Sequence, residues 1–423
     1  MLKPEKKFKI FCVVGTRPEF IKMYPVYKKF WQKSEENRSG KKIEVSWVLS
    51  SQHTDMLVDL EKFFKLKADF GFGIDDQHLD SLSGDYLAQK AASILQKAAI
   101  LFSSEKPDLL ILQGDTLTAQ QCALAGFYQG IPIAHVEAGI RTNDIKAPFP
   151  EELSRRIISQ VADLNFAPGA RALNTLEAEK ILFKKKSFNF LTGNTVVDTL
   201  DYVVNRISTP GFQWEGLEMA YKSFDQEELD LIDWMDKHGN KQIVLITAHR
   251  RESFGEAHLN LANAVLRLAE RFKNTDISFV ISLHKNEQAR KPFELLYQKS
   301  IELNLDNLYF FEAINYPLFV KLMQSASFIV TDSGGIQEEA PYLSKPVLIF
   351  RNETERTEGI DYGMARLVGT EEHLIHGAIL ELLTDNKSYN SMIKTGLQPY
   401  GDGLAAERIA EICLLFLREK GLN

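Results

Sequence analysis

The chain has 423 residues, of which 44% are hydrophobic and 25% are charged, and its formal net charge at pH 7 is −7. This length allows two or three domains, each with a buried core. A negatively charged chain has no general attraction for nucleic acid, so an anionic ligand would need a local cluster of basic side chains. The composition therefore argues against a nucleic-acid partner and favours a large enzyme or binding protein.

The cysteine pattern and the hydropathy bear on location. Cys12, Cys122 and Cys413 lie far apart and form no CxxC pair, which argues against a zinc site or a disulfide framework and fits a reducing cytoplasm. The apolar run near the N-terminus ends in Gly-Thr-Arg-Pro-Glu instead of the small residues of a signal-peptide cleavage site. No window approaches the roughly 18 consecutive apolar residues of a membrane span. We expect a cytoplasmic protein with no membrane partner.

Short apolar runs alternate with longer amphipathic stretches along the chain, which is the pattern of a parallel sheet wrapped by helices. In the first half, strands are predicted within 9–15, 43–50, 108–115, 132–137, 164–168 and 190–194. A second series is predicted within 242–249, 277–284, 308–313, 327–335 and 346–350. The repetition predicts an α/β fold with two doubly wound halves.

A polar, charge-rich segment from about 205 to 240 separates the two series and predicts a linker with a helix. Its Trp214 and Trp234 argue against disorder. The last stretch has apolar residues at helical spacing, and its pattern fits a final helix of either half.

In open α/β sheets, ligands bind beyond the carboxyl ends of the strands, so the residues there are the candidate site. The first predicted strand is followed by "GTRPEFIK", in which Thr16 and Glu19 have the spacing of a capping box. A well-started helix does not explain Gly15, Arg17 and Lys22. A glycine that allows close approach, a helix N-terminus and two cations suit a phosphate group.

Carboxylates follow other strands of the first half. Asp115 ends a strongly apolar strand, although an aspartate there is often only a helix N-cap. The block "HVEAGIRT" repeats the arrangement with His135, Glu137 and Arg141. "PFPEELSRR" then starts a helix, where the alternative role of Glu151 is to complement the helix dipole.

The second half offers an imidazole and a second anion loop. "TAHRRESFG" places His249 and Arg251 after an apolar strand, and a histidine beside two arginines is an unlikely core residue. "TDSGGIQEEAP" (331–341) has a serine and two glycines suited to an anion, while Glu338 has the alternative reading of a first-turn acid.

Motifs for metals and redox cofactors are absent from the sequence: it has no HExxH, no Walker loop and no GxGxxG after a strand. What remains is a set of arginines, two anion loops, several carboxylates and an imidazole. This combination suits a diphosphate ligand that undergoes proton transfer.

Several longer blocks occur in a fixed order: "GTRPEFIKMYPV", "QHTDML", "QGDTLTA", "HVEAGIRT", "FPEELSRR", "TGNTVVDTL", "TAHRRESFG", "DSGGIQEEAPYLSKPVLIFR", "TERTEG" and "PYGDGLAAERIAE". In these blocks, from about residue 9 to the C-terminus, the chain resembles the non-hydrolysing UDP-N-acetylglucosamine 2-epimerases. The resemblance implies two Rossmann-like domains of the glycosyltransferase-B type facing a central cleft. The first domain would be 1–195 with the final helix, about 404–423, packed back on it, and the UDP-binding domain would be 196–403.

The resemblance also implies a reaction. Members of the family interconvert UDP-N-acetylglucosamine and UDP-N-acetylmannosamine by eliminating UDP to give 2-acetamidoglucal and then adding it back. They need no cofactor or metal, commonly form homodimers, and supply cell-envelope polysaccharide biosynthesis. We therefore expect a cytoplasmic isomerase that acts on these two nucleotide sugars.

By the same resemblance, Asp115, Glu137 and Glu151 are the acid/base candidates, and His249 lies close to the diphosphate. Which carboxylate takes the proton from C2 stays open. The residues implied in substrate binding are Gly15, Arg17, Lys22, Arg251, Ser333, Gly334, Gly335 and Glu339. Among these, Glu339 would accept hydrogen bonds from the ribose hydroxyls.

The chain departs from the family pattern at two blocks. The usual Thr-Gly-Gln-His is "SSQH" at 50–53, and the usual "ERPE" is "ERTE" at 355–358. Gln52 and His53 are the candidate residues of a second, regulatory substrate site. In regulated members an arginine comes shortly before a "QxL" triplet, whereas here Asp76 precedes Gln77. This difference argues against allosteric activation by a second substrate molecule.

Other functions stay open at the level of sequence. One is a hydrolysing epimerase that releases UDP and N-acetylmannosamine, and another is a 2-epimerase of a different UDP-N-acetyl sugar. The intact "HVEAGIRT" and "QGDTLTA" blocks favour the non-hydrolysing type, and "EAGIRTND" favours the N-acetylglucosamine substrate. A glycosyltransferase would need an acceptor site, which the sequence does not reveal. A nucleotide-sugar sensor without turnover would be expected to lack one of the three carboxylates.

Overall fold

The computed structural model describes residues 7–36, 43–51, 55–74, 84–184, 186–212, 214, 221–222, 228–229, 231–239, 241–250, 253–284, 286–312 and 314–421. The chain divides into two compact units. Unit 1 comprises residues 1–201 and 401–423, and unit 2 comprises residues 202–400. Among the described residues, no helix is both long enough and apolar enough to cross a bilayer.

Unit 1 is built on a seven-stranded parallel sheet with the order β3-β2-β1-β4-β5-β6-β7. Its strands are β1 (Phe8–Val14), β2 (Ile43–Ser51), β3 (Phe70–Ile74), β4 (Leu109–Gln113), β5 (Ile133–Val136), β6 (Leu164–Ala167) and β7 (Phe188–Leu191). Its helices are α1 (Arg17–Glu36), α2 (Asp55–Phe64), α3 (Gly84–Glu105), α4 (Leu117–Tyr128), α5 (Glu151–Val161), α6 (Ala170–Phe183), α7 (Thr195–Ile207), which begins in this unit, and α16 (Ala405–Gly421).

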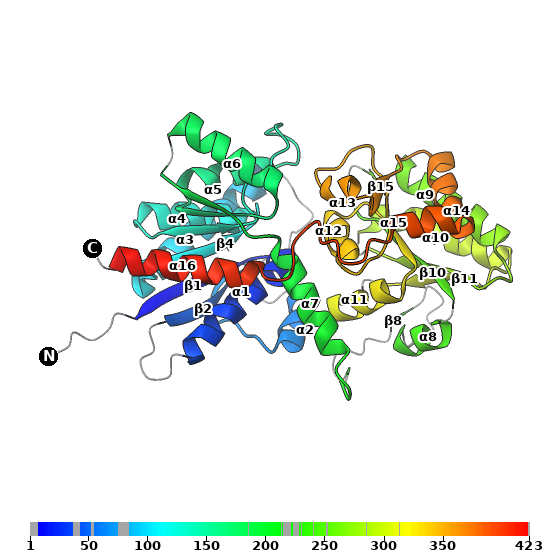
Figure 1. Cartoon of the computed structure of the whole chain (residues 1–423), viewed down its shortest axis with the longest axis horizontal. Helices are drawn as coiled ribbons and strands as arrows, with labels where there is room; N and C mark the ends of the chain where they lie inside the picture. Colours follow the sequence, from blue (N-terminus) through cyan, green and yellow to red (C-terminus); the bar gives the residue numbers. More distant parts are fainter. Residues whose placement is uncertain are drawn as a thin grey trace. The chain divides into compact units, whose positions relative to one another are not determined.

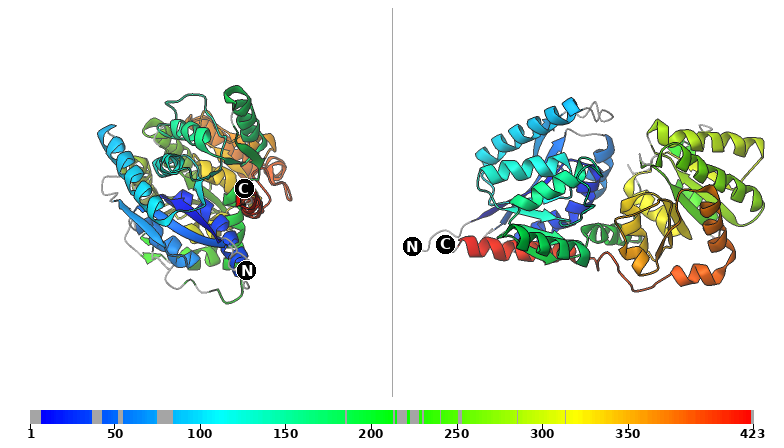
Figure 2. Two further views of the ribbon diagram at one scale, coloured as in Figure 1. Left: turned by 90° about the vertical axis from the view of Figure 1, so that its left-hand side faces the viewer. Right: turned by 90° about the horizontal axis from the view of Figure 1, so that it is seen from above.

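Side chains of β1 alternate between the two faces of this sheet, as the period of two along a strand requires. Phe11 and Val13 pack with Phe102 of α3 in one apolar cluster. The other face is covered by α1, whose Phe20 ring meets the Trp47 ring of β2 at 5.0 Å. Helix α16 contacts α1 (Figure 1), and Figure 2 shows α3 and α16 on opposite sides of the strands. The sheet is thus covered on both faces.

Helix α16 is held to unit 1 by polar contacts at its first turn. The backbone N–H of Ala406 donates to Asp198 of α7 at 2.8 Å. Glu407 pairs with Lys29 of α1 at 2.9 Å and with Lys33 at 2.5 Å. These bonds fix α16 against α1 and α7.

Unit 2 is built on a six-stranded parallel sheet with the order β12-β11-β10-β13-β14-β15. Its strands are β10 (Gln242–Thr247), β11 (Ile277–Ser282), β12 (Leu308–Phe311), β13 (Phe328–Thr331), β14 (Val347–Ile349) and β15 (Ala365–Leu367), and a separate antiparallel pair is formed by β8 (Tyr221–Lys222) and β9 (Glu228–Leu229). Its helices are α8 (Leu231–His238), α9 (Glu256–Arg271), α10 (Glu287–Glu302), α11 (Tyr316–Ser325), α12 (Gly334–Tyr342), α13 (Glu358–Asp361), α14 (Glu372–Thr384) and α15 (Asn386–Met392).

The prediction of an α/β fold with two doubly wound sheets is confirmed. In each sheet the strand order reverses once, between β1 and β4 in unit 1 and between β10 and β13 in unit 2. Loops that leave neighbouring strands at such a point diverge to opposite faces and leave room for a ligand at the carboxyl ends. The sequence blocks that follow β1, β4, β10 and β13 therefore lie where each unit can bind a ligand.

Two strands of the parallel sheets were not predicted from the sequence. The strand β3 reads "FGFGI", and its two glycines lower its strand propensity. The strand β15 has three residues and lies at a sheet edge. Strand β7 is Phe188–Leu191, so the predicted strand at 190–194 was placed too late. Both omissions concern edge strands, which carry weak apolar signals.

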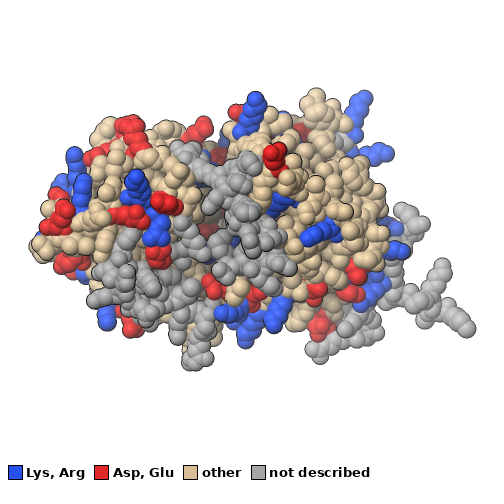
Figure 3. Space-filling model, turned by 180° about the vertical axis from the view of Figure 1, so that it is seen from behind, with Lys and Arg blue, Asp and Glu red and all other residues tan. Residues whose placement is uncertain are grey.

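Surface charges of both signs are mixed on one face of the protein. On the face drawn in Figure 3, the basic and acidic side chains of the described residues are interspersed, and neither sign covers a continuous area there. The described residues of that face therefore form no broad basic area for a ligand with several negative charges.

Candidate active site

In unit 1, Glu19 ties together the loops that follow β1 and β4. Its Oε2 accepts the backbone N–H of Gly15 at 3.0 Å, and its Oε1 accepts the hydroxyl of Thr116 at 2.6 Å. The Glu19 N–H donates to Thr16 Oγ1 at 3.4 Å, which confirms the predicted capping box. Glu19 is buried, and this burial raises its pKa to about 7 although the hydrogen bonds favour the ionised form.

Gly15 lies in a place that admits no side chain. A Cβ atom there would meet Thr118 Oγ1 at 2.2 Å and Ser50 Oγ at 2.4 Å. These two hydroxyls bond each other at 2.7 Å and are buried. The loop after β1 can therefore pass so close to the start of α4 only because residue 15 is glycine.

Glu137 follows β5 and has a left-handed backbone conformation, with φ of 63°. Its Oε2 accepts the ammonium of Lys22 at 2.5 Å and the Nε2 amide of Gln113 at 2.8 Å. Only 9% of the Glu137 side chain is exposed, so the ion pair is shielded from water. The structure thus joins Lys22 and Glu137, two residues that were predicted for the site separately.

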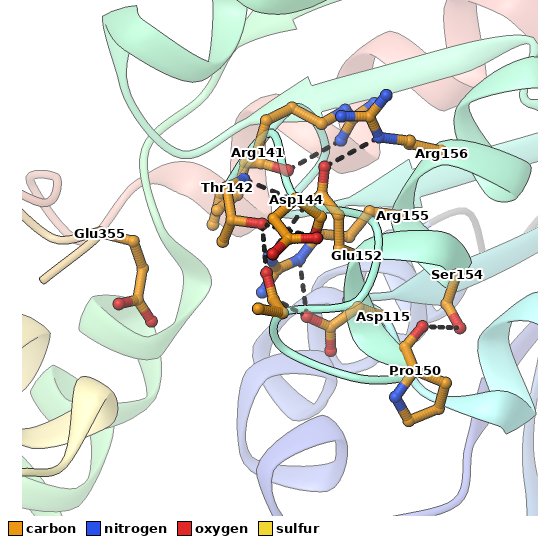
Figure 4. Close-up of polar contacts among 12 residues, drawn as sticks. Asp115, Arg141, Thr142, Asp144, Pro150, Glu152, Ser154, Arg155, Arg156 and Glu355 are labelled. Atoms are coloured by element: carbon orange, nitrogen blue, oxygen red, sulfur yellow. Dashed lines mark hydrogen bonds and ion pairs between the residues drawn. The ribbon is translucent and has the colours of Figure 1, made fainter. Parts of the chain in front are cut away.

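Asp115 follows β4 and is held by Arg155 of α5, as Figure 4 shows. The Arg155 Nε lies 2.8 Å and its Nη2 lies 2.6 Å from Asp115 Oδ2. A quarter of the Asp115 side chain is exposed. Sequence reasoning missed Arg155. The available signal was its spacing of four residues from Glu151, which puts both side chains on one face of a helix.

Glu151 begins α5 and lies in its first turn, where a carboxylate also complements the helix dipole. The neighbouring Glu152 has a structural role, because it is fully buried and accepts the Thr142 N–H at 3.1 Å and the Arg156 Nε at 2.9 Å (Figure 4). Glu151 is half-buried. The two adjacent glutamates therefore differ in their surroundings.

Two further residues of the "HVEAGIRT" block serve the structure of unit 1. His135 is fully buried, and its Nε2 lies 2.7 Å from the carbonyl oxygen of Gly114. Burial lowers the pKa of His135 to about 4, so the ring is neutral at pH 7. Arg141 donates to Glu179 at 2.8 Å and to Ser159 at 2.8 Å. Arg17 is the first residue of α1 and is half-buried.

In unit 2, the fully buried Asp332 organises the loops that follow β10 and β13. Its carboxylate accepts the backbone N–H of His249 at 3.1 Å and that of Arg250 at 2.9 Å. The two strands are also joined through the hydroxyls of Thr247 and Thr331, 2.7 Å apart. Sequence reasoning did not single out Asp332, although it lies within the "TDSGGIQEEAP" block.

That loop leads into the N-terminus of α12. Ser333 is the N-cap residue, and Gly334 and Gly335 are the first two residues of the helix. The helix therefore begins with N–H groups beside a hydroxyl, as an anion site needs. A Cβ on Gly334 would lie 2.8 Å from Arg356 Cζ, so the Arg356 guanidinium rests against this glycine. Arg356 was missed as a site residue, although the "TERTEG" block contains it.

The glutamates of α12 have separate partners. Glu338 is 2% exposed and accepts the Nε of Arg356 at 2.9 Å. The reading of Glu338 as a first-turn acid is wrong, because it lies beyond the first turn and pairs with Arg356. Glu339 accepts the hydroxyl of Tyr316 at 2.6 Å. This bond holds the carboxylate that was predicted to meet ribose hydroxyls.

Three arginines surround Glu355 in the same unit. Arg351 Nη1 lies 3.2 Å and Arg250 Nη2 lies 3.5 Å from its carboxylate, and Arg356 also donates to it. Burial opposes ionisation of Glu355, but the charges of Arg356, Arg250 and Arg351 outweigh it and lower its pKa to about 2. Glu355 and Glu338 together therefore offset two of the three positive charges in this cluster.

Some predicted residues cannot be placed. Arg251, Gln52, His53 and Asp76 lie outside the described residues. Among the residues that are described, no group of three or more histidine, cysteine, aspartate or glutamate side chains could hold a metal ion.

Two Rossmann-like units with polar side chains gathered at their strand reversals define an α/β protein of the glycosyltransferase-B type. The model of the family described as UDP-N-acetylglucosamine 2-epimerase matches residues 35–414. The enzyme of that name from Campylobacter jejuni is 38% identical over 407 residues, which cover 96% of this chain and 97% of its own. The one from Bacillus subtilis is 35% identical over 406 residues, with coverage of 96% and 95%.

Solved structures agree with this match. The crystal structure of UDP-GlcNAc 2-epimerase from Neisseria meningitidis, bound to UDP-GlcNAc, superimposes with a TM-score of 0.79 at 34% identity, covering 96% of this chain and 100% of that one. An S. aureus protein solved with UDP gives a TM-score of 0.77 at 33% identity, covering 97% of each chain. The chain belongs to the UDP-N-acetylglucosamine 2-epimerase family, whose members are isomerases. The predicted family is thereby confirmed.

Proposed function

We propose that the protein interconverts UDP-N-acetylglucosamine and UDP-N-acetylmannosamine by elimination and re-addition of UDP. The observation that carries this proposal is the shielded Lys22–Glu137 pair, which joins the segments that follow β1 and β5 in unit 1. The bonds from Lys22 and Gln113 both reach Oε2 of Glu137, so the carboxylate is fixed through one oxygen. A carboxylate held in this way suits proton transfer at a sugar carbon.

The chemistry explains why carboxylates and cations are both needed. The C2 hydrogen of the sugar is not adjacent to a carbonyl, so its removal must be coupled to another bond change. A carboxylate takes the C2 proton, the C1–C2 double bond forms, and the electrons of the C1–O bond leave with UDP. Return of a proton to the other face of C2 and of the UDP oxygen to C1 completes the inversion. Asp115, Glu137 and Glu151 are the proposed acid/base residues.

Unit 2 would hold the UDP part. The N–H groups at the start of α12 and the Ser333 hydroxyl suit the diphosphate, and Arg356 adds a cation beside Gly334. Glu339, oriented by the Tyr316 hydroxyl, suits the neutral ribose hydroxyls. His249 is proposed to act at the departing diphosphate, where an imidazole protonated on both nitrogens can donate to the developing negative charge.

The reaction can be tested directly with the purified full-length protein. We expect that incubation with UDP-N-acetylglucosamine in D₂O, followed by NMR, gives both UDP-sugars with deuterium at C2. Release of free N-acetylmannosamine and UDP would instead indicate the hydrolysing type. A substrate that remains unchanged, with no deuterium uptake, would refute catalysis altogether.

The role of the α12 loop predicts a difference between its two glycines. Gly334→Ala should raise the Kd for UDP about 10-fold, because the new Cβ displaces the Arg356 guanidinium and weakens a charge-assisted contact. Gly335→Ala should change the Kd less than about 2-fold, since the nearest atom to its Cβ is Ser333 Oγ at 4.0 Å. Isothermal titration calorimetry with UDP measures both. Equal effects of the two substitutions would contradict the proposed place of the diphosphate.

A further inference from the structure

His258 in α9 is a fully buried imidazole that the proposed reaction does not use. The rings of Phe254, Phe293 and Phe350 surround it, with centroids 5.5, 6.1 and 6.0 Å away. Its Nε2 lies 3.4 Å from Asp332 Oδ2, while its Nδ1 has no hydrogen-bond partner among the described residues. The three phenylalanine rings leave His258 one polar side-chain contact, to Asp332, and this contact fixes the orientation of the imidazole.

The hydrogen between His258 and Asp332 can be assigned. Burial alone would raise the pKa of Asp332, but the bond from His258, the nearby His249 and two backbone N–H groups outweigh it and lower that pKa below its ordinary value. Asp332 is therefore ionised at neutral pH, and an ionised carboxylate only accepts hydrogen bonds. His258 must then carry a hydrogen on Nε2, directed at this carboxylate, while its Nδ1 lies on the apolar side.

The two oxygens of Asp332 have different side-chain partners. Oδ2 accepts from His258 and from the backbone N–H of Arg250. Oδ1 lies 3.4 Å from the Nδ1 of His249, and the His249 backbone N–H donates to both oxygens at 3.1 Å. On another side, the His249 ring stacks on that of His284, with centroids 5.5 Å apart and planes inclined by 24°. The Asp332 carboxylate thus contacts His249 and is itself bonded by His258.

We propose that His258 is a positioning residue, which holds the Asp332 carboxylate so that its Oδ1 keeps the His249 imidazole in one orientation with the hydrogen on Nδ1. The other nitrogen of His249 is then the one that faces the ligand. A base oriented by a third group in this way is a common arrangement where an imidazole transfers protons. The inference deepens the proposed function and rests on the role of His249 in it.

The opposing explanation is that His258 only fills space among three phenylalanines. Glutamine and asparagine separate the two explanations. The amide nitrogen of Gln reaches the position of the imidazole Nε2, whereas the amide of Asn ends near the position of Nδ1, away from Asp332. If His258 were only a filler, the two variants would differ little, because both place an amide in the same apolar cage.

We expect His258→Asn to lower kcat about 10-fold. This loss is smaller than the roughly 10²-fold loss of rate that misplacement of a catalytic group by 1 Å can cause. His258→Gln should restore kcat to within about 2-fold of the unchanged protein, and both variants should keep its Kd for UDP. His258→Phe, which matches the surrounding rings, should behave like His258→Asn. The ring ¹⁵N resonances of His249, assigned by their loss in His249→Gln, should shift in the Asn and Phe variants and stay in place in the Gln variant.

Equal kcat values for the Asn and Gln variants, or a loss of UDP affinity as large as the loss of kcat, would overturn the inference. The NMR comparison does not depend on turnover. If the unchanged protein proved inactive, the proposed function would fail. The position of the His249 resonances in the Asn variant would still decide whether His258 orients that ring, and unaltered resonances would refute it.

Discussion

Replacing Glu137 with glutamine is expected to lower kcat by about 10² to 10⁴, the usual contribution of a general acid or base. The amide keeps the shape of the side chain but cannot take a proton from C2. Affinity for UDP should stay within about 2-fold, because Glu137 belongs to unit 1 and the proposed UDP groups belong to unit 2. Steady-state kinetics with UDP-N-acetylglucosamine and calorimetry with UDP measure the two quantities.

The matched control is Glu177→Gln. Glu177 lies in the same unit and accepts the Asn189 side-chain amide at 2.9 Å, outside the proposed site, so its replacement should leave kcat unchanged. Asp115→Asn and Glu151→Gln, measured alongside, rank the three carboxylates. If Glu137→Gln changed only UDP affinity, or if the control lost as much activity, Glu137 would not be an acid/base residue.

Gly15→Ala is expected to have a large effect although it adds only one methyl group. The new Cβ would meet the Thr118 and Ser50 hydroxyls at 2.2 and 2.4 Å, so the loop after β1 must move. Overpacking of this kind lowers the free energy of unfolding by about 1 to 3 kcal/mol. The movement also carries the Gly15 N–H away from Glu19, and kcat/KM should fall about 100-fold, as misplacement by 1 Å can cause.

The control for this prediction is Gly84→Ala. Gly84 begins α3, and a Cβ there meets nothing within 4 Å, so the substitution should leave activity unchanged and stability equal or slightly higher. Denaturant unfolding and steady-state kinetics on both variants give the comparison. A fully active and equally stable Gly15→Ala protein would show that the close approach of the two loops is not required.

The sequence alone predicted the parts of the fold that depend on local pattern. Apolar runs between amphipathic stretches gave the two parallel sheets, and "GTRPEFIK" gave the start of α1. The edge strands β3 and β15 were missed, because glycines in one and a length of three residues in the other leave little apolar signal. The local sequence pattern therefore predicted the central strands of each sheet better than the edge strands.

The partners of the site residues could not be predicted in the same way. Lys22 and Glu137 are 115 residues apart, and Asp115 and Arg155 are 40 apart. Such pairs form only because the strand order brings particular strand ends close together, and that order is not encoded in the period of the apolar residues. The motifs therefore predicted which residues gather at the strand ends, while their bonding followed only from the sheet topology.

In unit 1, the protonation state of Glu19 affects both the stability of the fold and the order of the loops that follow β1 and β4. Because its pKa in the fold is about 7 against an ordinary value of 4.5, the folded chain binds a proton that the unfolded chain has released between these pH values. The free energy of unfolding therefore decreases as pH rises from 4.5 to about 7. Only the ionised form, however, accepts from both the Gly15 N–H and the Thr116 hydroxyl without presenting a hydrogen of its own. Near pH 7 the folded chain therefore contains both forms of Glu19, and the form that best orders the two loops is the one that burial disfavours.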